Sequence, residues 1–175
     1  DVQFISSPNY DDRPPGNEIS LLVIHNISMP PDVFEGDGVI DLFTNQLNLD
    51  VSYYESIRGL KVSAHFFVRR NGEIIQFVSC RKRAWHAGKS CWKEKECCND
   101  FSIGVEMEGS DTTPFTDSQY VALVSLTMEL SRVYPIADII GHSDIAPKRK
   151  TDPGPYFDWR HYQEALHLAK LRAGG

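Results

Sequence analysis

VSAHFFVRRNGEIIQFVS, residues 62–79, is the stretch that decides the fold. Two runs rich in aromatic and β-branched residues flank Asn71-Gly72, a strong short signal for a β-hairpin because both residues tolerate a positive φ. A hairpin requires its two strands to pair antiparallel. Since strand and helix patterns mix along the remaining chain, we expect an α/β fold, a single-domain mixed β-sheet flanked by helices.

Three further strands are expected outside the hairpin. The run ISLLVIHNI, about residues 19–27, is too apolar and too β-branched for a surface loop and predicts a central strand that carries His25. FSIGVEME, residues 101–108, predicts another, in which Glu106 departs from the apolar pattern. A short strand in ADIIGH leads to His142.

Helices are predicted from periodicity and from caps. Apolar residues recur at helical spacing between residues 38 and 49. A capping box at Thr116 and Gln119 opens an amphipathic helix that Pro135 ends, and Asp158 caps a last helix. The segments expected to be irregular are 1–18, which forms a lead-in, 50–59 and 81–100.

The composition is that of an ordinary globular protein. The 175 residues, 41% hydrophobic and 24% charged, fit one domain spanning residues 1–175. With a net charge of −6 and no long run of Lys or Arg, neither nucleic acid nor an anionic membrane is an expected partner. No apolar run reaches the ~18 residues that span a bilayer, and the first residues do not resemble a secretion signal, so we expect a cytoplasmic protein.

The four cysteines are even in number, but their spacing matches no disulfide scaffold or zinc knuckle. They are interpreted as reduced thiols, as is usual in a cytoplasmic protein. One alternative stays open, a small structural metal site at Cys91, Cys97 and Cys98.

A metal site is indicated by two histidines and an aspartate. Pro153 disfavours the helical region for Asp152, and in an extended segment side chains two residues apart share a face, so Lys150 and Asp152 should point to one side of their loop. Those two alone would suit a solvated ion pair equally well. Together, His25, His142 and Asp152 make a three-ligand set with an open fourth position, which is how catalytic zinc is held.

Five segments of the chain, within about residues 7–162, form a recognisable set: LLVIHNIS, VSAHFFVRRNGEIIQFV, RAWHAG, CNDFSIGVEMEG and GHSDIAPKRKTDPGPYFDW. In this order they resemble the AmpD-type N-acetylmuramoyl-L-alanine amidases, the cytoplasmic branch of the amidase and peptidoglycan-recognition fold. The resemblance implies that His25, His142 and Asp152 bind one Zn²⁺ per chain. It also implies that Glu106 and Lys150 assist catalysis and that Tyr53 lies near the metal.

The implied substrate is a small soluble muropeptide, the 1,6-anhydro-N-acetylmuramyl peptide of wall turnover, which is cut between the lactyl group and L-alanine. The resemblance implies a bacterial enzyme, and we expect a monomer. An amide is a poor electrophile, so its hydrolysis needs an activated water and a group that stabilises the oxyanion. Zinc lowers the pKa of a bound water from ~16 towards ~7. Glu106 is then suited to proton transfer and Lys150 to oxyanion stabilisation.

The resemblance implies substrate contacts at five further residues, namely Asn26, Lys61, Ala84, Trp85 and His86. Trp85 and His86 are expected either to wall a sugar groove or simply to pack. Asn26 follows a ligand in a strand and would face the other way unless the strand has ended. Lys61 and Cys97 stand where members of this branch use arginines, which leaves recognition of the stem peptide open because neither makes a bidentate fork.

Several residues have competing interpretations. In one interpretation Glu106 faces solvent together with Glu108, and His65 is expected to be a hydrogen-bonded histidine packed under the site. His142 and Asp144 fit half of an iron facial triad that His161 or His167 would complete, although both are expected at the surface. A non-catalytic muropeptide-recognition module is the other rival. Such a module would be expected to lack a zinc ligand or an assisting residue. This chain has all three ligands and both assisting residues, Glu106 and Lys150.

Overall fold

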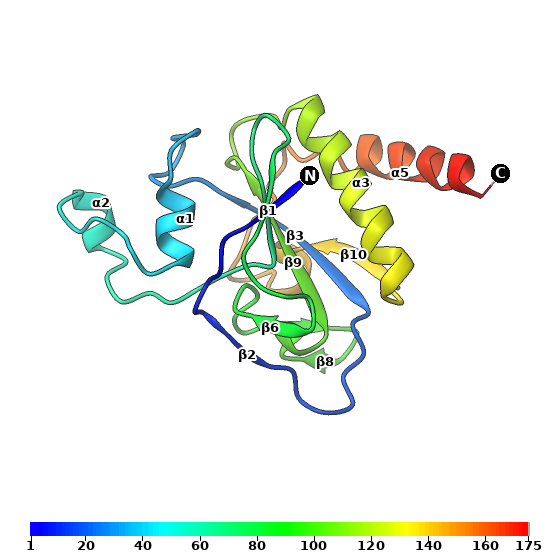
Figure 1. The fold of residues 1–175 in the computed structure, drawn as a ribbon, viewed down its shortest axis with the longest axis horizontal. Coiled ribbons are helices and arrows are strands. Elements are labelled where there is room, and N and C mark those ends of the chain that lie inside the picture. Colours follow the sequence, from blue (N-terminus) through cyan, green and yellow to red (C-terminus); the bar gives the residue numbers. More distant parts are fainter. Residues whose placement is uncertain (175) are drawn as a thin grey trace.

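A computed structural model describes residues 1–174, and a six-stranded sheet forms their centre (Figure 1). Its strands, in spatial order, are β1 (Val2–Phe4), β5 (Ile74–Gln76), β4 (Phe66–Val68), β9 (Ser102–Glu108), β3 (Leu21–Ile27) and β10 (Asp138–Gly141). β4 and β5 pair antiparallel and all other neighbours pair parallel. The mixed sheet predicted from the hairpin is therefore confirmed.

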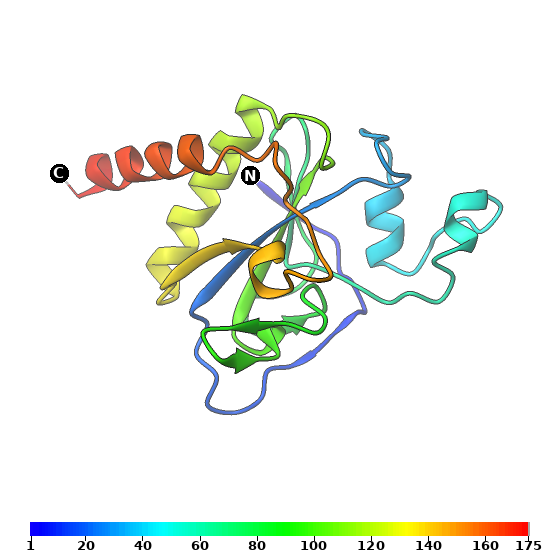
Figure 2. The same cartoon turned by 180° about the vertical axis from the view of Figure 1, so that it is seen from behind.

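A long helix, α3 (Asp117–Val133), covers one face of this sheet, and a second, α5 (Trp159–Ala173), packs against α3 and projects beyond the sheet (Figures 1 and 2). Leu22 and Ile24 of β3 and Val105 of β9 belong to the apolar core that these helices complete. Side chains alternate along a strand, so His25 and Glu106 point to the opposite face. The period of two thus separates the core residues from the polar residues on the same strands.

The opposite face carries shorter elements. α1 (Gly38–Phe43) and α2 (Ser52–Glu55) belong to an excursion, residues 28–62, that projects to one side of the sheet (Figures 1 and 2). Apolar residues of α1 pack against Phe67, Ile75 and Phe77. The helical turn α4 (His142–Ile145) follows β10 directly.

The predicted caps of the long helices are confirmed. The Thr116 hydroxyl accepts a hydrogen bond from the Gln119 N–H, and the Gln119 side chain accepts one from the Thr116 N–H, both at 3.1 Å. Asp158 accepts the His161 N–H at 2.9 Å. α3 ends at Val133, two residues before Pro135. These local signals are independent of long-range contacts, which is why sequence alone located them.

Two helix predictions need correction. α1 ends at Phe43 and does not continue to residue 49, because Asn45 takes a left-handed conformation with φ of 59°. The segment 50–59 was expected to be irregular but contains α2, whose four residues are too few to show a period. The hairpin turn also differs in detail. Arg69 N–H donates to Glu73 O at 2.8 Å around a three-residue loop, and of Asn71 and Gly72 only Gly72 has a positive φ, 87°.

The two remaining segments expected to be irregular contain short strands. The lead-in supplies β1 and β2 (Tyr10–Asp12), and residues 81–100 supply β6 (Lys82–Ala84), β7 (Cys91–Trp92), β8 (Lys95–Glu96) and a 3₁₀ turn, η1 (Cys98–Asp100). β2 pairs antiparallel with β6 across about seventy residues of chain. Strands of two or three residues are defined by such pairing and are too short to show a periodicity in the sequence.

The sheet topology gathers the ends of four strands. β4, β9, β3 and β10 run parallel, so their carboxyl ends lie at one edge, where α/β sheets commonly bind ligands. His25 and Glu106 are register partners near that edge, and His142 follows β10 there. Among residues 1–174, no helix is long and apolar enough to cross a membrane.

Candidate active site

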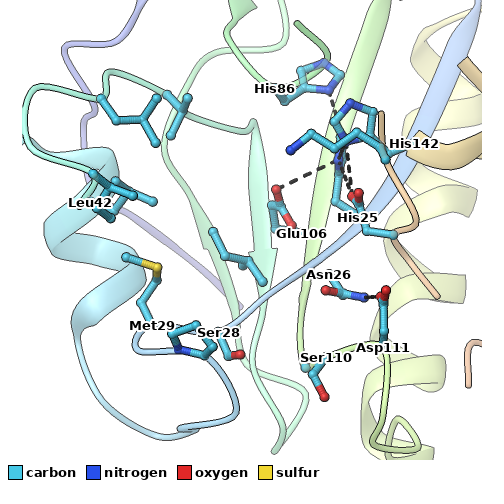
Figure 3. A pocket seen from close by; sticks show the side chains of 18 of the residues that line it. His25, Asn26, Ser28, Met29, Leu42, His86, Glu106, Ser110, Asp111 and His142 are labelled. Atoms are coloured by element: carbon cyan, nitrogen blue, oxygen red, sulfur yellow. Dashed lines mark hydrogen bonds and ion pairs between the residues drawn. The ribbon is translucent and has the colours of Figure 1, made fainter. Parts of the chain in front are cut away.

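Three metal-ligating side chains meet at this edge of the sheet. The Nδ1 atoms of His25 and His142 are 3.0 Å apart, and Asp152 Oδ2 lies 3.0 Å from the first and 3.2 Å from the second (Figure 3 shows the two histidines). Both histidines are buried, with 1% and 4% of their surfaces exposed. The set predicted from the sequence is brought together by β3, the start of α4 and the loop after it.

The donor set fits a zinc ion. Ligand bonds of ~2.0–2.2 Å in a tetrahedron place the ligand atoms about 3.3–3.5 Å apart, close to the spacings seen here. The His142 Nε2–H donates to the Ala87 carbonyl at 2.9 Å, so in the neutral ring the Nδ1 lone pair faces the other two ligand atoms. Two imidazole nitrogens and a carboxylate oxygen are thus directed at one point, and no proton of His142 lies between them. Such a set suits a cation.

The ionisation of these groups is also suited to metal binding. Burial lowers the pKa of His25, which keeps the ring neutral. Burial alone would raise the pKa of Asp152, but hydrogen bonds with His142 and His25 outweigh it and hold the pKa below its ordinary value. Metals bind neutral imidazole and ionised carboxylate, so neither group must lose a proton at neutral pH.

Glu106 lies beside the metal-binding set. Its Oε1 is 3.9 Å from His25 Nδ1, and its Oε2 is buried without a hydrogen-bond partner among the described residues (Figure 3). Burial, followed by repulsion from Asp152, raises the pKa of Glu106 well above its ordinary value, while Lys150 opposes the rise. A carboxylate with one free oxygen and a raised pKa is suited to accepting a proton.

Glu106 does not face solvent. It is 9% exposed, and Glu108, which shares its face, is 3% exposed. The carboxylate of Glu108 has a structural position, because it accepts the Glu35 N–H at 2.9 Å and the Arg70 N–H at 2.8 Å. The interpretation of both residues as a solvated pair is therefore wrong.

A cavity of about 560 Å³ opens in front of these groups. Lys150 and Asp152 both line it, as their predicted shared face requires. The opposite wall belongs to residues 28–62 and is largely apolar, and its lining includes Met29, Leu42, Tyr53, Ile57, Leu60 and Val62 (Figure 3 labels Met29 and Leu42). The cavity thus has a polar reactive wall and an apolar wall.

The predicted substrate contacts divide into two groups. Asn26, Trp85 and His86 line the cavity. Ala84 does not, because it is 0% exposed and pairs with Tyr10 in the β2–β6 ladder, so the expected contact there is corrected. Lys61 is exposed and borders an adjoining hollow of about 150 Å³ instead of the main cavity.

Asn26 also has a role that the sequence did not indicate. Its side-chain NH₂ donates to Asp111 Oδ1 at 2.7 Å and to the Pro153 carbonyl at 2.9 Å (Figure 3). The Thr151 hydroxyl donates to the other oxygen of Asp111. Asp111 therefore ties β3 to the loop that holds Asp152, a link between segments far apart in sequence.

Two more histidines lie beneath the ligands. The His65 Nδ1 accepts the Gly104 N–H at 3.0 Å, and its Nε2–H donates to Lys82 O at 3.0 Å, which confirms the predicted packed histidine. His86 is 9% exposed, and its Nδ1 lies 2.9 Å from His25 Nε2 (Figure 3). Its ring contacts a metal ligand directly.

The alternative metal sites are not assembled among residues 1–174. Asp144 accepts the Gly141 N–H at 2.8 Å and caps α4, while His161 and His167 are exposed on α5, as predicted. All four cysteines are free thiols. Within residues 1–174, the grouping of three or more metal-ligating side chains is His25, His142 and Asp152, so the cysteine site is not supported.

Comparisons with known proteins agree with this site. The model of the N-acetylmuramoyl-L-alanine amidase family matches residues 15–155. The 1,6-anhydro-N-acetylmuramyl-L-alanine amidase AmpD of Enterobacter cloacae is 51% identical over 95% of this chain and 90% of its own length. A crystal structure of an AmpD derivative superposes with a TM-score of 0.91 at 49% identity, covering 93% of both chains. The Escherichia coli amidase AmiD, solved with the substrate anhydro-N-acetylmuramic acid-L-Ala-D-γ-Glu-L-Lys, has a TM-score of 0.61 at 31% identity, over 83% of this chain and 56% of that one.

Proposed function

Because the chain belongs to the N-acetylmuramoyl-L-alanine amidase family, we propose that it hydrolyses the amide bond between the lactyl group of (1,6-anhydro)-N-acetylmuramic acid and L-alanine in muropeptides. One zinc ion per chain is held by His25, His142 and Asp152. The observation that carries the proposal is their convergence beside Glu106, which lines the cavity and has one carboxylate oxygen without a hydrogen-bond partner among the described residues. Activity in peptidoglycan recycling follows from the same membership.

The side chains divide the chemistry between them. Zinc at this site would supply a Lewis acid and a water acidic enough to lose its proton near neutral pH. Glu106 accepts that proton and returns it to the leaving amine, which otherwise departs as an unstable anion. Lys150 places a positive charge near the tetrahedral oxyanion, an effect worth about 3–4 kcal/mol where a single donor has been removed in other enzymes.

The substrate is a single soluble fragment. A cavity of about 560 Å³ is within the range that holds small molecules, about 300–1,000 Å³, and suits one muramyl unit with the start of its peptide. Trp85 offers a ring to the sugar, Asn26 and His86 line the polar side, and Tyr53 lies on the opposite wall. The enzyme acts as a monomer in the bacterial cytoplasm, where fragments of the wall are recycled.

The test compares two substrates at matched amide concentration. Purified protein is given an anhydromuramyl tripeptide or isolated sacculi, and peptide release is followed by mass spectrometry. The expected result is fast release from the fragment of a peptide that begins with L-alanine, with slow release from sacculi. Comparable rates would overturn the assignment to fragments, and no release from either would overturn the activity.

A further inference from the structure

The two imidazole ligands are supported by consecutive residues of one segment. The His25 Nε2 lies 2.9 Å from the Nδ1 of His86, and the His142 Nε2–H donates to the carbonyl of Ala87 at 2.9 Å. Both bonds use the ring nitrogen that does not face the metal-binding point. The segment that follows β6 therefore reaches both ligands from behind, one by a side chain and one by the backbone.

A single side-chain oxygen fixes that segment. Asn99, on η1, accepts the backbone N–H of His86 at 3.2 Å and that of Ala87 at 2.9 Å through its Oδ1. Asn99 is buried, with 9% of its surface exposed. The Ala87 carbonyl also accepts a hydrogen bond from Arg149 at 2.7 Å, so the backbone here is held from both sides.

The strand that carries Glu106 makes room for the His86 ring. A Cβ atom added at Gly104 would lie 2.5–2.7 Å from three atoms of that ring, so only glycine fits there. Ser102, on the same face of β9, places its hydroxyl 3.1 Å from His86 Nε2. The ring is therefore held at both nitrogens and packed on the strand.

The hydrogen bonds have one consistent direction once a metal is bound. A ring that binds metal through Nδ1 keeps its proton on Nε2, so His25 donates to the Nδ1 of His86. His86 then carries its own proton on Nε2 and donates to Ser102.

We propose that His86 and Asn99 are positioning residues of the metal centre, which orient the two imidazole ligands through the His86 ring and the Ala87 carbonyl. This inference rests on the proposed zinc site. It gives the RAWHAG and CND segments a role in orienting the metal ligands, which is separate from any contact with substrate. Partners of this kind commonly change metal affinity by about 10–100-fold when removed.

The test uses His86→Phe, His86→Asn and Asn99→Ala in the full chain. Phe keeps a ring of similar shape but offers His25 no acceptor, whereas the Asn side-chain oxygen occupies about the place of the histidine Nδ1. Zinc affinity is measured by competition with a chromophoric chelator, and the Tm of each metal-free protein is recorded. Trp85→Phe, the adjacent cavity residue, is the matched control.

We expect zinc to bind about 10–100-fold more weakly to His86→Phe and about 10-fold more weakly to Asn99→Ala. The zinc affinities of His86→Asn and Trp85→Phe should stay within about threefold of the wild-type value. Unchanged zinc affinity in folded His86→Phe and Asn99→Ala, with only a raised KM or a lower Tm, would overturn the inference and leave the zinc site intact. If His86→Phe does not fold, Asn99→Ala decides the question alone. Failure of the wild-type protein to bind zinc would instead overturn the proposed function itself.

Discussion

The metal-side wall of the cavity is buried and hydrogen-bonded, whereas the opposite wall, residues 28–62, is apolar and partly exposed. His25 and His142 are 1% and 4% exposed, but Tyr53 is 38% and Leu60 is 48% exposed across the cavity. The first wall stands on the central strands of the sheet, and the second stands on two helices of six and four residues. A rigid scaffold thus holds the reacting groups, and a surface with fewer constraints meets the substrate.

This difference predicts two kinds of effect. Changes on the metal-side wall should lower turnover, because those groups act on the reacting atoms. Changes on the opposite wall should act on substrate binding and leave turnover nearly intact.

Metal removal should have the largest effect. Dialysis against a strong chelator should abolish hydrolysis, because His25, His142 and Asp152 alone offer no electrophile, and added zinc should restore it. Metal content by atomic emission, followed together with peptide release, checks both steps. Full activity in metal-free protein would contradict the proposed chemistry.

Glu106→Gln should follow, with kcat lowered by about 100-fold or more while zinc remains bound, since the variant removes proton transfer and no ligand. Glu108→Gln is the matched control on the same strand face. It should lower the Tm, because Glu108 holds Glu35 and Arg70, but leave kcat near wild type. Equal losses of kcat in the two variants would show that Glu106 acts only through the structure.

Lys150→Ala is expected to lower kcat by about 100-fold through loss of the charge beside the oxyanion. Lys148→Ala removes the same charge two residues away at an exposed position that does not line the cavity. Steady-state kinetics on an anhydromuramyl peptide compare the two. If Lys150→Ala keeps wild-type turnover, the assigned role is wrong.

Acid should act on stability through the histidines under the metal-side wall, since residues 28–62 contain none. Burial lowers the pKa of His65 to about 3 from its ordinary value of 6.5. The unfolded chain then binds the proton more readily than the folded one, so this contribution to stability is complete above about pH 6.5 and is lost as the pH falls towards 3. In His65→Asn the free energy of unfolding should fall less steeply as the pH is lowered. The slope should be smaller than that of the wild type by up to about 1.4 kcal/mol per pH unit. Urea unfolding of metal-free protein between about pH 6 and pH 4 measures the slope, and an unchanged slope would refute the assignment.

The smallest effect is expected at Leu60, on the apolar wall. Leu60→Ala should raise KM about two- to fivefold with kcat unchanged, because the loss of a few tens of Å² of buried apolar contact is worth up to about 1 kcal/mol. Leu49→Ala removes the same group from an exposed position outside the cavity lining. A fall in kcat in Leu60→Ala would mean that the apolar wall also affects turnover and does not act on substrate binding alone.

The sequence alone determined the elements that have local causes and indicated the three side chains, His25, His142 and Asp152, that the fold brings together. The capping box of α3, the cap of α5, the hairpin and the two central strands follow from short-range patterns, and Pro153 predicted which side Asp152 shares with Lys150. His25 and Glu106 were recognisable because a charged or imidazole side chain is costly inside an apolar run and needs a reason to be there.

Tertiary structure alone decided the features that depend on distant partners. β1, β2 and β6 exist because other strands pair with them, and the same pairing buries Ala84. His86 lies against His25 as well as on the cavity wall, because the glycine at position 104 leaves space for its ring. Asn99 and Asp111 are ordinary loop residues in sequence, and only the folded chain brings their oxygens to the segments that hold the metal ligands. The physical reason is that a hydrogen bond between distant segments depends on where the whole chain places two groups, which no local pattern encodes.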